Sequence, residues 1–285
     1  MTTSYILLSI TSSLTLFQVR KILISIGIVF SAISALYEGI ISFQTLIFLG
    51  LLGAISYFYH NLQLPNKYIK VTLFLVLLGL IALSTPFHVV PGVSNALVFD
   101  RITVSAMSKP YSMFLNFDNT IIAQILCVTS SLIHKEESFN RKAALNTFIL
   151  LMLCILIILI PAYFSGFIRF DPKIPSILPL WLLNNLLFVC LSSEVVYRGF
   201  LQSNIQGFLK LYVKHSFWPI LISSILFGLS HYKNGLIMIS LSTICGLLYG
   251  YAYHKTGKVL SAMLVHLGLN LCHLLLFTYP SAVIK

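Results

Sequence analysis

The sequence predicts an all-α, polytopic membrane protein: a helix bundle with about ten membrane segments. Of its 285 residues, 58% are hydrophobic and only 9% are charged. A soluble domain carries about 25% charged residues. The mean hydropathy of +0.95 supports the same conclusion. We therefore expect an integral, multi-pass protein in contact with a lipid bilayer, with the bacterial inner membrane as its location.

Ten apolar segments reach or approach the length of a membrane helix. A span needs about 20 residues to cross the hydrocarbon core, so the first, second and fifth segments are the weakest of the ten. Most Lys and Arg residues fall in the loops that are cytoplasmic if both termini lie outside, which favours that orientation. The segments are about 4–18, 22–38, 41–59, 70–91, 120–134, 143–163, 176–204, 216–232, 236–253 and 258–279.

A stretch at about 92–119 interrupts the apolar pattern. It follows a Pro91-Gly92 turn signal and mixes aromatic and aliphatic residues with charged ones. Disordered segments are poor in aromatic and β-branched residues, and this stretch is not. We expect a structured outer loop or an interfacial segment.

The net charge of +11 has a topological explanation. In a soluble protein it would suggest nucleic acid, but basic residues also collect in cytoplasmic loops. The sequence has no zinc-finger spacing and no compact basic stripe, so we expect no nucleic-acid partner. The five cysteines lie in apolar segments without C-x-x-C spacing, which predicts buried small side chains rather than a disulfide framework or a metal site.

Three polar clusters in the last third of the chain each place two key residues four positions apart. On an α-helix these positions share a face. An ionisable group inside a membrane span costs about 2.5–3.5 kcal/mol on insertion scales, which makes it a functional-site hypothesis. The pairs are Glu194 with Arg198, Phe227 with His231, and His266 with Asn270.

Each cluster also has a purely structural interpretation. Glu194 could activate water as a general base, or it could form a brace with Arg198 that does no chemistry. His231 could be a polar residue that ends a helix. His266 and Asn270, with His273 three residues further on the same face, could donate hydrogen bonds to an oxyanion or only to neighbouring helices.

Two glycine patterns indicate close helix packing near these clusters. Gly228 would let another backbone approach the second cluster. Gly246 and Gly250 form a G-x-x-x-G pattern in the ninth segment, which could press against the helices that carry the clusters.

Taken together, the three clusters resemble the CPBP family of intramembrane endopeptidases. This family includes type 2 CAAX prenyl endoproteases and bacteriocin-processing or self-immunity proteins. Its pattern is E-E-x-x-x-R, then F-x-x-x-H, then H-x-x-x-N, and the resemblance covers about 176–279. It implies two regions: N-terminal membrane helices with an outer loop at 1–175, and a CPBP-like catalytic core at 176–285.

The resemblance implies an endopeptidase mechanism without a metal or other cofactor. A glutamate and His231 activate water, and His266 and Asn270 stabilise the oxyanion. Glu194 matches the second glutamate of the family pair, and Arg198 the arginine that braces it. The implied partner is a membrane-associated protein or peptide substrate.

One position departs from the family pattern. Ser193 stands where the family has its first glutamate, the expected activator of water. A serine hydroxyl is not a base near pH 7. Glu194 could take over that role, Ser193 could act as a nucleophile, or the chain could be an inactive relative that binds a membrane peptide or confers immunity. Two further alternatives are a zinc protease that uses Glu194, His231 and His266, and a transporter.

Overall fold

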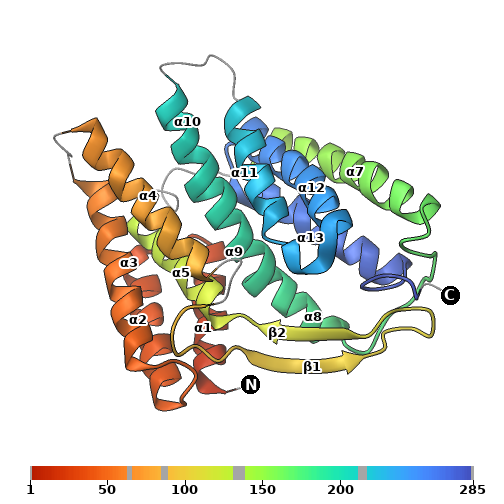
Figure 1. Cartoon of the computed structure of the whole chain (residues 1–285), viewed down its shortest axis with the longest axis horizontal. Helices are drawn as coiled ribbons and strands as arrows, with labels where there is room; N and C mark the ends of the chain where they lie inside the picture. Colours follow the sequence, from red (N-terminus) through yellow and green to blue (C-terminus); the bar gives the residue numbers. More distant parts are fainter. Residues whose placement is uncertain (1, 63–65, 85–88, 131–138, 211–216, 284–285) are drawn as a thin grey trace. The chain divides into compact units, whose positions relative to one another are not determined.

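The helical membrane architecture predicted from the sequence is confirmed in the computed structural model (Figure 1). The structure describes residues 2–62, 66–84, 89–130, 139–210 and 217–283. Within these ranges, six helices are long and apolar enough to cross a membrane. They are α3 (Phe43–Asn61), α4 (Lys67–Ser84), α7 (Arg141–Phe164), the helix Leu178–Leu209, Tyr232–Thr256, which includes α12 (Gly235–Thr256), and α13 (Val259–Leu276).

Shorter apolar helices account for the other four predicted segments. The first, second and fifth segments were expected to be short, and they are. The eighth is short as well within the described residues. These helices are α1 (Thr3–Leu16), α2 (Lys21–Tyr37), α5 (Phe117–Thr129) and α11 (Phe217–Leu229).

One compact unit is formed by the described residues of 1–96, 116–137 and 187–201. Helix α5 is its centre and contacts α1, α2, α3, α4 and the segment α9 (Leu191–Glu194). Most side chains of α5 are buried, and the amide of Gln124 donates to the hydroxyl of Ser12 at 2.8 Å. A helix enclosed by protein does not need the length of a lipid-exposed span.

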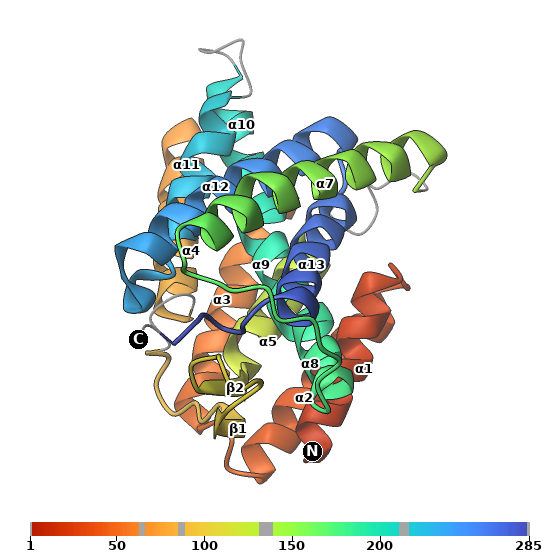
Figure 2. The same ribbon diagram turned by 90° about the vertical axis from the view of Figure 1, so that its right-hand side faces the viewer.

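The other compact unit comprises the described residues of 97–115, 138–186 and 202–285. Within it, α12 packs against α11, α13 and α7, and α13 also packs against α7. Figure 2 shows α7 and α12 side by side. Small residues make these contacts possible. A Cβ on Gly246 of α12 would lie 3.0 Å from the Cα and Cβ of Ser224 of α11.

The helix Leu178–Leu209 changes its winding along its length. Its α-helical parts are α8 (Leu178–Asn184), α9 and α10 (Ser203–Leu209). Two π-helical stretches separate them, η1 (Asn185–Cys190) and η2 (Val195–Gln202). Residues 187–201 of this helix belong to the first unit and its two ends to the second.

The segment at 92–119 is ordered, as expected, but it contains strands that the sequence did not predict. β1 (Ala96–Ile102) and β2 (Tyr111–Leu115) form a two-stranded sheet, and Figure 1 shows them running in opposite directions. Residues 277–283 bond to the connection between the strands, through Lys109 N–H to Ser281 O at 2.9 Å. They also bond to the loop after α7, through Thr278 N–H to Arg169 O at 2.9 Å.

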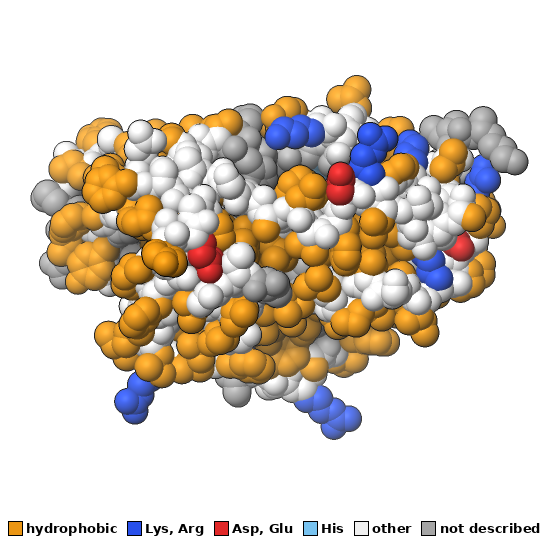
Figure 3. Space-filling view, turned by 90° about the horizontal axis from the view of Figure 1, so that it is seen from below, with side chains coloured by type: hydrophobic (Ala, Val, Ile, Leu, Met, Phe, Trp, Pro, Cys, Tyr) orange, Lys and Arg blue, Asp and Glu red, His pale blue; other side chains and the backbone are white. Residues whose placement is uncertain are grey.

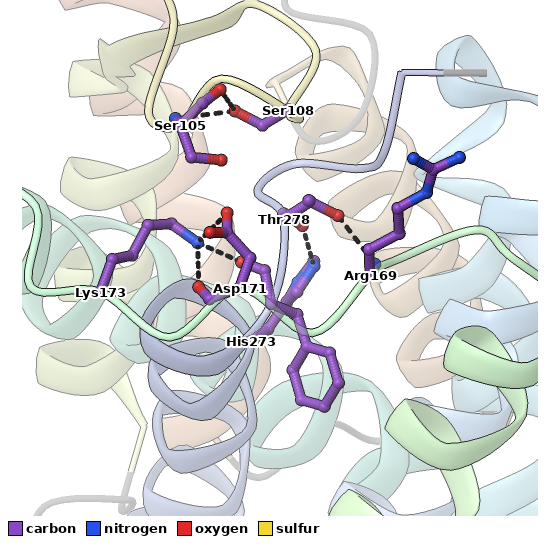
Figure 4. A network of polar contacts seen from close by, with 8 residues as sticks. Ser105, Ser108, Arg169, Asp171, Lys173, His273 and Thr278 are labelled. Atoms are coloured by element: carbon purple, nitrogen blue, oxygen red, sulfur yellow. Dashed lines mark hydrogen bonds and ion pairs between the residues drawn. The ribbon is translucent and has the colours of Figure 1, made fainter. Parts of the chain in front are cut away.

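Polar side chains join the same segments in the second unit (Figure 4). The Nζ of Lys173 lies 3.1 Å from Oδ2 of Asp171 and donates to the carbonyl of Phe277. The Nε2 of His273 lies 3.1 Å from the carbonyl oxygen of Thr278. The end of α13 is therefore tied to the loop that follows α7.

Large apolar side chains are exposed along several helices. In a soluble protein such continuous apolar faces are rare, whereas a lipid-facing helix requires them. Figure 3 shows hydrophobic side chains over much of one face with scattered charges. On α2 the exposed residues include Ile22, Leu23, Ile26, Val29, Phe30 and Ile33, and on α7 they include Leu145, Phe148, Ile149, Leu153, Leu156 and Ile160.

Candidate active site

Glu194 and Arg198 form a fully buried ion pair in the first unit. The Nε of Arg198 lies 3.1 Å from Oε2 of Glu194, and both side chains are 0% exposed. Burying two charges is costly, and a close opposite charge offsets part of that cost. The pairing expected from the four-residue spacing is therefore present. Ser193, the neighbour of Glu194, is partly exposed.

The two π-helical stretches flank the residues that carry this pair. Glu194 ends α9, which lies between η1 and η2, and Arg198 lies inside η2. A π-helix closes i→i+5 hydrogen bonds, so each stretch shifts the faces of the residues that follow it relative to an α-helix. Such stretches are rare and frequently lie at functional sites. This helix therefore does not follow the uniform α-helical spacing assumed from the sequence.

His231 lies just after α11, and the structure indicates which of its ring nitrogens carries a proton. Nδ1 is 3.0 Å from the carbonyl oxygen of Phe227. A carbonyl only accepts hydrogen bonds, so Nδ1–H is the donor of the neutral imidazole. Nε2 is then the unprotonated nitrogen, which is the form that a general base requires.

The second and third clusters meet at one aromatic ring in the second unit. The ring of Phe227 lies 5.1 Å from the imidazole of His231 and 5.9 Å from that of His266, measured between centroids. Two imidazoles from α13 and from the end of α11 therefore pack around the same side chain. His231 and His266 thus belong to one aromatic contact group in the second unit, with Phe227 in common.

His266 is held by a residue that the sequence analysis did not single out. Tyr249 of α12 stacks on it with centroids 4.7 Å apart and planes 17° apart. The ring centroid of Tyr249 also lies 6.0 Å from that of Phe227. The G-x-x-x-G pattern that brackets Tyr249 was the available signal, because it marks the face of α12 that packs closely against other helices.

Asn270 pairs with a second residue that the sequence analysis missed. Its Nδ2 donates to Oδ1 of Asn185 at 3.0 Å. The signal was the dipeptide Asn184-Asn185 inside an otherwise apolar span. His273 does not share in this contact. It bonds to Thr278, and its ring lies 5.1 Å from that of Tyr279.

A comparison with known protein families finds a match for the part of the chain that holds the polar clusters. Residues 175–272 match a family described as type II CAAX prenyl endopeptidase, Rce1-like. The predicted resemblance is confirmed for this region. No curated protein and no solved structure matches the chain.

The Rce1-like region contains all three polar clusters. The match supports a CAAX-protease-type intramembrane endopeptidase fold, and with the long apolar helices it supports an integral, multi-pass membrane protein. It also contains both newly found residues, Asn185 and Tyr249. The description of the matching family names an endopeptidase, and the long apolar helices suit a lipid bilayer.

Glycines in the Rce1-like region allow close approach between α12 and its neighbours. A Cβ on Gly228 would fall 1.9 Å from Oγ1 of Thr243 and 2.7 Å from the carbonyl oxygen of Ile239, both in α12. A Cβ on Gly250 would fall 2.8 Å from Oε1 of Gln202, whose Nε2 donates to the Gly250 carbonyl at 3.0 Å. The close approach expected at Gly228 and at the G-x-x-x-G pattern is therefore present.

Proposed function

We propose that the protein is an intramembrane endopeptidase that hydrolyses a peptide bond in a membrane-associated protein. The observation that carries this proposal is the packing of His231 and His266 around Phe227 inside the region that matches the Rce1-like family. His231 is bonded to the Phe227 carbonyl and His266 is stacked on Tyr249, so the two imidazoles have different surroundings and can serve two different roles in one hydrolysis.

In the proposed mechanism, Glu194 and His231 activate a water molecule. Nε2 of His231 is free to accept a proton from water while Nδ1–H is held by the Phe227 carbonyl. Glu194 takes the role of the carboxylate base because Ser193 occupies the position of the family's first glutamate. Arg198 supplies a positive charge 3.1 Å from the Glu194 carboxylate and holds this side chain in place.

His266 and Asn270 stabilise the oxyanion of the tetrahedral intermediate. Each has an N–H group that can donate to the negative oxygen formed when water attacks the carbonyl carbon. Removing one such donor typically lowers kcat by about 10²–10³. The stack of His266 on Tyr249 limits the rotation of the imidazole plane, which supports a preorganised donor.

The test uses purified protein in detergent micelles and a panel of quenched fluorescent peptides. One peptide ends in a farnesylated C-a-a-X sequence, and the others are unmodified membrane-proximal sequences. We expect cleavage that Glu194→Ala and His231→Ala each abolish. The double variant should lose no more than either single variant, because residues that act as a unit are non-additive. Activity that survives both changes would exclude the mechanism.

A second candidate function is a non-enzymatic membrane protein that binds a peptide or confers immunity. Ser193 favours it, because the family's expected water activator is missing. The discriminating variant is Ser193→Glu. An inactive relative should gain peptidase activity from this change, whereas an active serine-bearing enzyme should not need it. Protection of cells by a Glu194→Ala variant would favour the binding function.

A further inference from the structure

The amide of Asn270 has a fixed partner on a neighbouring helix. Its Nδ2 donates to Oδ1 of Asn185 at 3.0 Å, and the Asn185 side chain is buried. We propose that Asn185 is a positioning residue that orients the amide of Asn270 toward the oxyanion. This inference rests on the proposed function, because it gives a role to a residue that acts only through Asn270.

A second hydrogen bond determines which way the two amides face. Nδ2 of Asn185 donates to the carbonyl oxygen of Trp181 at 3.3 Å. A carbonyl can only accept, so Asn185 must turn its nitrogen toward Trp181 and its oxygen toward Asn270. That oxygen in turn accepts only, and Asn270 must therefore present its nitrogen. The orientation of both amides follows from the backbone of α8.

This orientation has a direct chemical consequence. The Nδ2 of Asn270 carries two hydrogens, and Asn185 uses one of them. The second remains on the same nitrogen and can donate to a negative oxygen. Without Asn185, the amide torsion is broad and roughly two-fold. A flipped Asn270 would then direct its own carbonyl oxygen at the developing charge.

The first carbonyl in this series of hydrogen bonds belongs to Trp181, whose side chain is held by its neighbours. Trp181 is fully buried, and its Nε1 donates to the hydroxyl of Tyr279 at 3.2 Å. The Trp181 ring also packs edge-on against that of Tyr279 at 5.9 Å. Supporting residues of this kind hold a reactive group in its productive geometry.

The experiment compares Asn185 with its neighbour Asn184. Both are buried asparagines of the same helix, but Oδ1 of Asn184 has no hydrogen-bond partner among the described residues. Asn184→Leu is therefore a matched control that removes a buried amide without touching Asn270. With the farnesylated C-a-a-X peptide as the probe, Asn185→Leu should lower kcat about tenfold and leave KM within about twofold. Asn184→Leu should change neither.

The same residue pair provides two further comparisons. Asn185→Asp as a neutral carboxyl can still accept from Asn270 and donate to Trp181, so it should retain more activity than Asn185→Leu. When Asn270 is already replaced by alanine, adding Asn185→Leu should lower kcat by a further factor of less than about two. A residue that acts through Asn270 then has nothing left to orient. A tenfold further loss in that case would overturn the inference.

The outcomes separate the inference from the function on which it rests. If the wild-type protein cleaves the probe and His231→Ala does not, the proposed function holds. An Asn185→Leu variant that is as active as wild type would then overturn the positioning role alone. If the wild-type protein cleaves none of the peptides, the proposed function fails, and the positioning role fails with it.

Discussion

Tyr249 and His266 lie in a nearly parallel stack, with ring centroids 4.7 Å apart and planes 17° apart. Tyr249 is 1% exposed, so its ring has little freedom to move away. Offset stacks between aromatic rings contribute about 0.5–1.5 kcal/mol beyond the area they bury. The stack therefore limits how far the imidazole of His266 can turn.

Replacing Tyr249 tests whether this stack supports catalysis. Tyr249→Phe keeps the ring and should keep kcat within about threefold of wild type. Tyr249→Leu removes the stack and should lower kcat about tenfold, because a misplaced donor stabilises the transition state less. Peptide cleavage by both variants is the measurement. Equal activity of the leucine and phenylalanine variants would assign the stack to packing alone.

Replacing Arg198 tests how much stability the protein loses when the buried Glu194 carboxylate has no cation beside it. Breaking a buried ion pair by removing one partner typically costs about 3–5 kcal/mol, because the remaining charge is uncompensated. Arg198→Met should therefore lower the unfolding temperature strongly and abolish cleavage. The double variant Glu194→Gln with Arg198→Met removes both charges and should recover most of the stability but no activity. Thermal unfolding in detergent measures both effects, and a double variant as unstable as Arg198→Met would contradict the argument.

The helices could be predicted because the bilayer leaves few alternatives. Backbone polar groups must be satisfied within each span, so long apolar runs become helices. The run at 143–163 is α7 (Arg141–Phe164), and the run at 258–279 contains α13 (Val259–Leu276). The strands β1 and β2 were missed because their residues do not alternate strictly between apolar and polar. The connection between the strands also bonds to a segment distant in the sequence, through Lys109 and Ser281.

The candidate site was predictable only where the contacts are local. Glu194 and Arg198 are four residues apart on one helix, and their spacing predicted the pair. Tyr249 and Asn185 contact His266 and Asn270 across different helices. Hydropathy and spacing do not determine the rotation of one helix against another. The π-helical stretches were also unpredictable, because 185–202 contains no proline and only one glycine.

Gly228 offers a test of the close approach between α11 and α12. Gly228→Ala should destabilise the protein, because its Cβ would overlap Oγ1 of Thr243 and the carbonyl oxygen of Ile239. Overpacking of this kind typically costs about 1–3 kcal/mol. Gly79→Ala in α4 is the control, since a Cβ there meets nothing within 4 Å and alanine favours the helix. A Gly228→Ala variant as stable as the Gly79→Ala variant would show that the helices can move apart at little cost.

The ionisation of Asp171, in the loop that follows α7, should make the stability of the protein depend on pH. Burial raises the pKa of Asp171, but the hydroxyl of Ser105 and the ammonium of Lys173 outweigh it and hold the pKa below the ordinary value of 3.8. Because the folded pKa lies below the unfolded one, the ionised carboxylate stabilises the fold above pH 3.8. This contribution is lost as the pH falls through the folded value.

The Asp171→Asn variant should therefore be less stable than wild type at pH 7, by about 1 kcal/mol, because the ion pair with Lys173 at 3.1 Å is lost. The difference should start to shrink below pH 3.8, where the carboxylate of the unfolded chain takes up its proton, and should disappear only when the pH falls below the lower pKa of the folded state. Asp100→Asn is the control, because Asp100 is exposed on β1 and its substitution should change the free energy of unfolding by less than about 0.5 kcal/mol. Unfolding temperatures of all three proteins between pH 7 and pH 3 give the answer. A difference between wild type and Asp171→Asn that stays constant over this range would mean that the carboxylate charge does not stabilise the loop.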